Sequence, residues 1–167
     1  TLLENESATL DALSRAVRGH DVLHVAAHAV ANESFPWRSQ LLLAPGGAAP
    51  DGAASLETLR AMDFSSLRLV VLSACRTASG PIARGEGVIS LVRPFLEQRV
   101  PAVVGTLWDV DDAAARGVMT RFHSAYANSR DPIGALQEAQ RALIDGGDPA
   151  LRSPRSWGAF IVTAPLP

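Results

Sequence analysis

The chain has 167 residues, of which 47% are apolar, and a formal charge of −2 at pH 7, which together predict one globular domain with its own hydrophobic core. All of its 15 basic residues are arginine and they form no basic stripe, so the composition argues against nucleic acid as a direct partner and excludes lysine chemistry such as Walker-type phosphate binding. No apolar run approaches the length of a membrane span, about 18 residues, and no signal peptide opens the chain, so we expect a cytoplasmic protein without a membrane partner.

The first predicted elements are a helix over residues 7–18 and an apolar strand over residues 21–30 that carries two histidines. His24 and His28 stand four residues apart, as in the zinc-binding His-Glu-x-x-His motif, but Val25 occupies the glutamate position and favours a strand. We therefore predict no metal site. His24 is interpreted as a core or edge histidine with a local hydrogen bond, and His28, placed at the end of the strand, is the functional candidate.

Residues 31–66 are the least regular part of the sequence. Turn residues surround a short strand at 40–43, which predicts a hairpin beside the site. A helix is expected over residues 55–61. Trp37 and Arg38 either line the substrate or pack on the surface.

A second apolar strand, residues 69–72, leads to the only cysteine, Cys75. Its unbroken apolar character predicts a strand buried on both faces of a parallel sheet. Cys75 would then follow the carboxyl end of the strand, where ligands bind in open α/β sheets, although a free cysteine also often packs as a small hydrophobe. His28 lies 47 residues before Cys75. If their strands are parallel neighbours, imidazole and thiol share one edge, as a thiolate nucleophile and its general acid require.

Beyond the cysteine, Gly85 and Gly87 predict a turn that opens a helix ending near residue 98. This turn lacks the third glycine and the lysine of a phosphate cradle. The remaining predicted elements alternate between strand and helix: a strand at 100–107, helices at 113–126 and 131–146, and a strand at 159–163. Such alternation predicts a mostly parallel α/β sheet with helices on both faces.

The order of these motifs resembles the CHAT domain family, in the caspase, gingipain and separase group of cysteine peptidases. The resemblance covers nearly the whole chain and is carried by His28 after its strand, Leu-Ser-Ala-Cys75, Gly85-Glu-Gly87, Leu107-Trp-Asp-Val110 and Ser156-Trp-Gly-Ala-Phe160. It implies a caspase-like three-layer sandwich, N-terminally truncated. Residues 1–167 would then form the C-terminal catalytic part of a longer protein with a helical-repeat or sensor domain.

The resemblance also implies a Cys-His dyad without a cofactor. Cys75 would attack a peptide carbonyl, His28 would protonate the leaving amine, and the backbone N–H groups of Ala29 and Cys75 would hold the oxyanion. The family usually has glycine after the histidine, where this chain has Ala29. The expected activity is that of a prokaryotic regulatory or defence protease that cuts a partner protein.

A specificity prediction comes from the segment around Trp108, which is similar to the Leu-Trp-Asp-Val-Thr-Asp segment of separases. An aspartate of that segment faces the arginine before the scissile bond in separases. The resemblance therefore implies a preference for a basic residue, bound by Asp109 or Asp111 and stacked on Trp108. The alternative is that these aspartates only begin the following helix.

Two other functions stay open. A catalytically silent protein-interaction module would keep the fold, with Ala29 as the first sign of decay. A small-molecule hydrolase is disfavoured because the chain lacks a Gly-x-Ser-x-Gly elbow.

Overall fold

The structure is a computed structural model that describes residues 1–32, 34–74, 76–80, 82–83, 87–88, 90–146 and 151–165. Cys75 and the first two residues of Gly85-Glu-Gly87 therefore lie outside the described residues. Predictions about the thiol itself therefore stay predictions, whereas Ala74 and Arg76 on either side of it are described.

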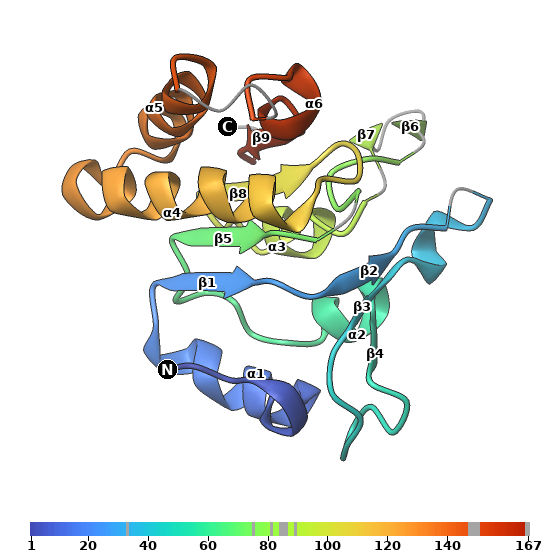
Figure 1. Ribbon diagram of the computed structural model, residues 1–167. Helices are drawn as coiled ribbons and strands as arrows, with labels where there is room; N and C mark the ends of the chain where they lie inside the picture. The colour runs from blue at the N-terminus through green and yellow to red at the C-terminus, as the bar shows by residue number, and fades with distance from the viewer. Residues whose placement is uncertain are drawn as a thin grey trace.

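Figure 1 shows how the helices and strands are arranged. The strands are β1 (Val22–Val25), β2 (His28–Val30), β3 (Gln40–Leu42), β4 (Ala53–Ser55), β5 (Leu69–Leu72), β6 (Ile82–Ala83), β7 (Gly87–Val88), β8 (Ala102–Thr106) and β9 (Phe160–Thr163). The α-helices are α1 (Leu10–Ala16), α2 (Leu56–Arg60), α3 (Arg93–Glu97), α4 (Asp112–Ser129), α5 (Pro132–Ile144) and α6 (Pro154–Trp157). Short 3-10 turns are η1 (Asn5–Ser7), η2 (Val17–Gly19) and η3 (Pro36–Arg38).

The central sheet has the strand order β1-β5-β8-β9. The histidine strand β1 pairs in parallel with the cysteine strand β5, and their last residues, Val25 and Leu72, face each other across the ladder. Strand β8 pairs in parallel with β5 on its other side, and β9 closes the sheet antiparallel to β8. The predicted parallel neighbourhood of the histidine and cysteine strands is confirmed.

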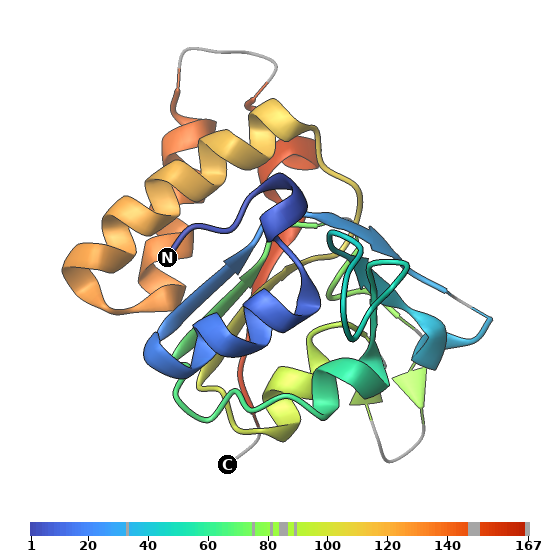
Figure 2. The same cartoon turned by 90° about the horizontal axis from the view of Figure 1, so that it is seen from below.

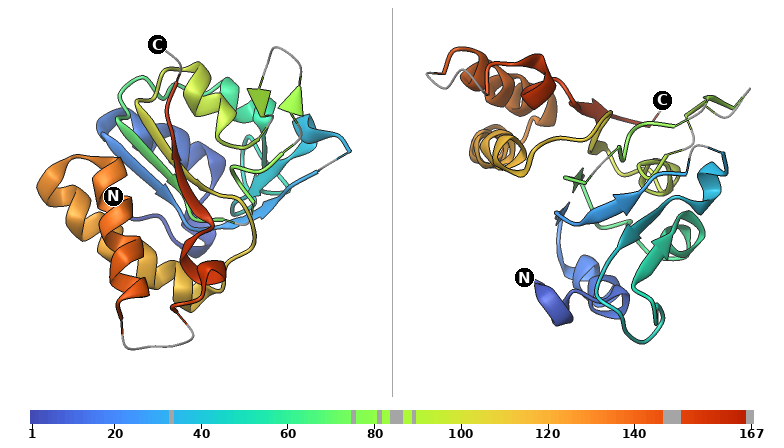
Figure 3. Two further views of the ribbon diagram at one scale, coloured as in Figure 1. Left: turned by 90° about the horizontal axis from the view of Figure 1, so that it is seen from above. Right: turned by 45° about the vertical axis from the view of Figure 1, so that its right-hand side comes forward.

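Helices cover both faces of this sheet, as Figure 2 and both views of Figure 3 show. Every residue of β5 and β8 is buried, and apart from Gly105 and Thr106 their side chains are apolar on both faces of the sheet. Alternate residues of β5 enter opposite cores: Val70 and Leu72 join the core under α1, α2 and α3, whereas Leu69 and Val71 join the core under α4 and α5. The predicted caspase-like three-layer sandwich is confirmed.

Helix starts follow the capping residues that the sequence provides. Asp111 caps α4, and its Oδ1 accepts hydrogen bonds from the N–H groups of Ala113 at 2.9 Å and Ala114 at 3.3 Å. Asp131 caps α5, whose first residue is proline, and Ser55 caps α2. These side chains satisfy backbone N–H groups that have no partner within the helix.

The predicted single strand over residues 21–30 is wrong: the chain makes two short strands there. Strand β1 ends at Val25, and His28 begins β2, which pairs antiparallel with β3 in a separate sheet completed by β4. The first strand stops because its partner stops: β5 ends at Leu72. The last hydrogen bond between the two segments runs from the N–H of Ser73 to the carbonyl of Val25, at 2.9 Å. The hairpin expected beside the site is this second sheet.

The predicted helix opening at the Gly85-Glu-Gly87 turn is also wrong. Residues 87–88 pair with residues 82–83 as a two-stranded ribbon, and α3 begins only at Arg93. Pro94 explains the late start, because proline lacks an N–H and is tolerated in the first turn of a helix but not in its interior. In the motif Ser156-Trp-Gly-Ala-Phe160, Ser156 belongs to α6 and only Phe160 belongs to the last strand, β9.

Candidate functional site

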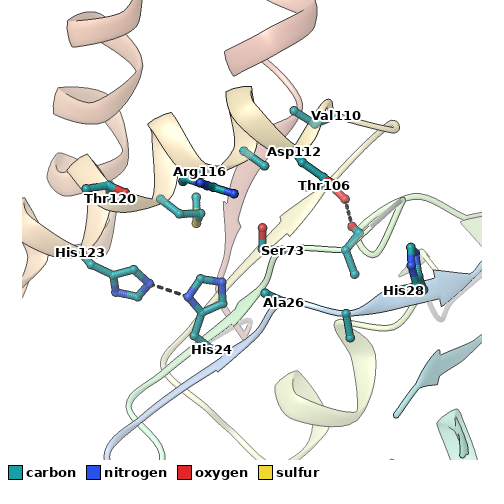
Figure 4. Close-up of a pocket in the computed structure, with 14 residues that line it drawn as sticks. His24, Ala26, His28, Ser73, Thr106, Val110, Asp112, Arg116, Thr120 and His123 are labelled. Atoms are coloured by element: carbon teal, nitrogen blue, oxygen red, sulfur yellow. Dashed lines mark hydrogen bonds between the residues drawn. The ribbon is translucent and has the colours of Figure 1, made fainter. Parts of the chain in front are cut away.

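A pocket of about 620 Å³ lies at the carboxyl edge of the sheet, beneath the first half of α4 (Figure 4). Its walls come from β1 and the segment after it, the residues after β5, the end of β8, and α4. The lining residues are His24, Ala26, Ala27, His28, Ser73, Ala74, Thr106, Val110, Asp112, Ala115, Arg116, Met119, Thr120 and His123. This is the edge at which the parallel strands predicted a site.

His28 stands at one end of the pocket (Figure 4). Its side chain is exposed, and among the described residues it makes no hydrogen bond or ion pair. Ser73 and Ala74 line the same pocket, and they are the two residues directly before Cys75. The structure therefore brings His28 together with the chain segment that leads into the cysteine.

Two buried threonines fix that segment against the end of β8. The hydroxyl of Thr106 donates a hydrogen bond to the carbonyl of Ala74, and the hydroxyl of Thr77 donates to the carbonyl of Leu72 at 3.2 Å. The N–H of Thr106 donates to the Thr77 hydroxyl at 3.0 Å, which links the two threonines. This Thr77–Thr106 clamp was missed from the sequence, where the two residues stand 29 positions apart and match no motif.

Close backbone packing holds the other side of the cysteine segment. A Cβ placed on Gly105 of β8 would lie 2.9 Å from the Cβ of Ala78 and 3.0 Å from Val92, so only glycine allows this approach. Arg76, directly after Cys75, has a φ of 55°, in the left-handed region that residues with a Cβ rarely occupy. Strained backbone of this kind clusters at functional sites.

The opposite end of the pocket holds a pair of histidines. Nδ1 of His24 and Nε2 of His123 are 2.9 Å apart, and their rings stack with centroids separated by 4.9 Å. The predicted hydrogen bond of His24 is therefore present, but its partner lies on α4 rather than nearby in the sequence. The His24 residue is nevertheless exposed to solvent, so only part of its ring is covered.

The protein around the two rings keeps them neutral at pH 7. Burial is the larger cause and repulsion from a charge on His123 the smaller one, and together they lower the pKa of His24 to about 4. Burial also lowers the pKa of His123 below its usual range. One ring N–H therefore donates to the other ring, and the pair carries no charge at neutral pH.

The residues predicted to bind a basic substrate side chain lie outside the lining of this pocket. The indole N–H of Trp108 donates to the carbonyl of Arg155 at 3.1 Å, and 37% of this side chain is exposed. Asp109 is exposed, and Asp111 caps α4 as described above. The acid that does line the pocket is Asp112, which lies in the first turn of α4.

Ala29, predicted to supply an oxyanion N–H, lies in the middle of β2 opposite Leu41. Its φ is not positive, so a side chain with a Cβ costs nothing in backbone conformation. Trp37 and Arg38 lie outside the pocket lining. They contact Phe35, with ring centroids of Trp37 and Phe35 at 5.6 Å and the Arg38 guanidinium 5.1 Å from the Phe35 centroid, as in surface packing.

The described part of the chain contains no group of three or more His, Cys, Asp or Glu side chains placed to hold a metal ion. Among the described residues, no helix combines the length and apolar character needed to cross a membrane.

Comparison with known proteins gives relatives that are much longer than this chain. Tetratricopeptide repeat protein 28 of Mus musculus is 32% identical over 95 residues, which are 57% of this chain and 4% of that protein. Tetratricopeptide repeat protein 28 of Homo sapiens is 29% identical over 96 residues, 58% of this chain and 4% of that protein. The chain thus matches a small part of each.

A family model described as the CHAT domain matches residues 1–164. This match includes the histidine strand, the cysteine strand and the closing strand in the order expected from the sequence. Because it extends over almost the whole chain, the protein belongs to the CHAT domain family.

Proposed function

We propose that the protein is a cysteine endopeptidase in which Cys75 and His28 form a catalytic dyad. The observation that carries the proposal is that His28, Ser73 and Ala74 line one pocket at the carboxyl ends of two adjacent parallel strands. A nucleophile and its general acid must share such an edge to reach the same peptide bond.

In the proposed reaction the Cys75 thiolate attacks the carbonyl carbon of the scissile peptide bond. The resulting oxyanion accepts hydrogen bonds from the backbone N–H groups of Ala29 and Cys75. The imidazolium of His28 gives a proton to the leaving amine, and the C–N bond breaks to leave an acyl-enzyme. The neutral His28 then takes a proton from a water molecule whose oxygen attacks the acyl carbon of the thioester. The C–S bond breaks, which releases the acid product and restores the Cys75 thiolate and the His28 imidazolium.

The dyad needs a cysteine segment that stays in place while the substrate binds. The Thr77–Thr106 clamp and the close approach at Gly105 support this role, because they tie the residues on both sides of Cys75 to β8. The strained backbone at Arg76 fits a turn that is held for function.

For specificity we propose a basic residue before the cleaved bond, bound by Asp109 and stacked on Trp108. Asp109 is the better placed of the two predicted acids, because Oδ1 of Asp111 already accepts two backbone hydrogen bonds. Both Trp108 and Asp109 are exposed on the loop that leads into α4, beside the pocket.

We also propose that the domain acts within a longer cytoplasmic protein that carries helical repeats, and that a sensor event in that region releases cleavage of one partner protein. The two relatives named for tetratricopeptide repeats support this arrangement. The prokaryotic regulatory or defence setting stays a prediction, and both of these relatives are mammalian.

The experiment that tests this function is digestion of a peptide library by the activated full-length protein. Cys75→Ala serves as the inactive reference, and Asp109→Asn and Asp111→Asn test the specificity. We expect cleavage mainly after Arg or Lys, weakened by Asp109→Asn. Cleavage after apolar residues that neither substitution changes would return both aspartates to a structural role. A digestion pattern identical to that of Cys75→Ala would favour the catalytically silent module.

A further inference from the structure

The wall of the pocket that α4 forms carries a cation whose charge is not balanced within the described residues (Figure 4). Arg116 lines the pocket from α4 and is exposed, and no hydrogen bond or ion pair is recorded for it in the part of the chain that the structure describes. Other arginines behave differently: Arg60 and Arg93 bind Glu97, and Arg130 binds Asp21. Arg116 is therefore a guanidinium that faces a cavity with its five donors available.

The acid nearest to it in sequence does not neutralise it. Asp112 stands one helical turn before Arg116 and lines the same pocket, yet the two side chains form no ion pair. Asp112 is in the first turn of α4, where the positive end of the helix dipole offsets part of its negative charge. The positive charge of Arg116 is thus the larger uncompensated charge on this wall.

The neighbouring histidine pair adds a neutral hydrogen-bond donor. Because one N–H is used between His24 and His123, whichever tautomer is present leaves one outer ring nitrogen of the pair with a proton. Both rings line the pocket, and Figure 4 shows them at the end opposite His28, below the helix that carries Arg116. A neutral N–H donor and a guanidinium that line the same pocket both favour an anionic hydrogen-bond acceptor.

We propose that Arg116, His24 and His123 form a subsite for an acidic side chain of the peptide substrate, at a position removed from the cleaved bond. The proposal rests on the peptidase function proposed above, and it assigns a second specificity element distinct from the one at Asp109. A cavity of about 620 Å³ has room for a peptide side chain in addition to the groups at the His28 end. Carboxylates bind guanidinium through two parallel charge-assisted hydrogen bonds, which selects Glu or Asp over Gln or Asn.

The test compares matched peptides in which Glu, Gln or Lys is scanned through the positions around the cleaved bond. For the wild-type full-length protein we expect kcat/KM to favour Glu over Gln by about tenfold at one position, mainly through KM, as a charge-assisted hydrogen bond provides. In Arg116→Gln the ratio falls to about one, and in Arg116→Glu the preferred residue at that position becomes Lys. Arg121→Gln is the matched control, because Arg121 is exposed on the same helix, bonds to the carbonyl of Gly117 and lies outside the pocket lining; it keeps the wild-type ratio.

A binding measurement separates this subsite from the peptidase proposal. The peptide acetyl-Ala-Ala-Glu-Ala-Ala-amide and its Gln counterpart are titrated into the Cys75→Ala protein while the imidazole NMR signals of His24 and His123 are followed. Shifts with the Glu peptide alone, lost in Arg116→Gln, support the subsite even if no peptide is cleaved, in which case only the peptidase function fails. Cleavage that proceeds equally on Glu and Gln peptides at every position overturns the subsite and leaves the peptidase standing. Absence of both selective shifts and cleavage overturns both.

Discussion

The two ends of the pocket each present an exposed histidine, but the two side chains differ in their hydrogen bonding. The His28 side chain makes no hydrogen bond with a described residue, whereas His24 is bonded to His123 and its pKa is lowered to about 4. A general acid at neutral pH must take up and release a proton in each cycle. Because His24 stays neutral at pH 7, the proposed function gives proton transfer to His28, and the proposed subsite gives binding to His24.

The sharpest way to break this comparison is to remove each histidine in turn. His28→Ala and Cys75→Ala should each reduce kcat by about 10³-fold to 10⁶-fold, because a nucleophile and its acid act as a unit. His24→Ala should cost far less, about tenfold, and mainly in KM. His20→Ala is the control, since its exposed ring bonds to the carbonyl of Ala16 outside this pocket. Steady-state kinetics on one cleaved peptide would decide, and a His28→Ala enzyme with near wild-type turnover would show that the dyad is wrong.

The second largest effect concerns the backbone beside His28. Ala29→Pro deletes the proposed oxyanion N–H and should lower kcat by about 10²-fold to 10³-fold, while Ala29→Gly is neutral or improves it. Proline also perturbs β2, so Val30→Pro is the matched control: it disturbs the same strand and leaves the Ala29 N–H intact. Equal losses in the two proline variants, with circular dichroism unchanged in both, would place the oxyanion elsewhere.

The third prediction tests how much the Thr77–Thr106 clamp, at the His28 end of the pocket, contributes to the free energy of unfolding. Thr106→Val keeps the shape of the side chain but leaves the carbonyl of Ala74 without its donor, which should lower the free energy of unfolding by about 1–3 kcal/mol. Thr106→Ser retains the hydroxyl and should recover most of the loss. Urea unfolding gives the free energies. The NMR signals of His24 and His123 should stay unchanged in Thr106→Val, and a shift there would mean that the two ends of the pocket are coupled.

The smallest effect is on the His24 end and appears with acid. Between pH 6.5 and about 4 the unfolded His24 binds a proton and the folded one does not, so stability falls as the pH is lowered through this range. The lowered pKa of His123 adds to the loss in the same direction. Solvent at the exposed part of the His24 ring limits the size of the effect.

This acid sensitivity is measured as the difference in urea midpoint between pH 7 and pH 5. His24→Gln should show a smaller difference than the wild type, because it removes one of the two groups that bind protons only when unfolded. An equal difference in both proteins would mean that the stability loss comes from other groups.

Features set by nearby residues were predictable, and features set by distant partners were not. The buried strands β5 and β8 and the helix starts at Asp111 and Asp131 follow from local apolar runs and capping side chains. The break after Val25 depends on where the partner strand β5 ends, and the residues around the break do not predict that position. The late start of α3 was readable from Pro94 and was missed.

The same distinction applies to the site. The parallel pairing of the histidine and cysteine strands was predictable because both are apolar runs in a pattern that alternates between strand and helix. The bond between His24 and His123 joins residues 99 positions apart, and the Thr77–Thr106 clamp joins residues 29 apart. Both depend on how α4 and β8 pack onto the sheet edge, so spacing in the sequence carries no sign of them.

The most direct measurement is the rate at which iodoacetamide alkylates Cys75 at pH 6.5. Because Cys75 is the only cysteine, a mass shift of the intact protein reports this residue alone. If His28 forms an ion pair with the thiolate, the folded wild type reacts at least about tenfold faster than the urea-unfolded chain, whose thiol has an ordinary pKa of about 8.5. The rate falls to the unfolded value in His28→Ala and stays at the wild-type value in the His20→Ala control. A wild type that reacts no faster than the unfolded chain, or a His28→Ala protein that reacts like the wild type, would contradict the dyad.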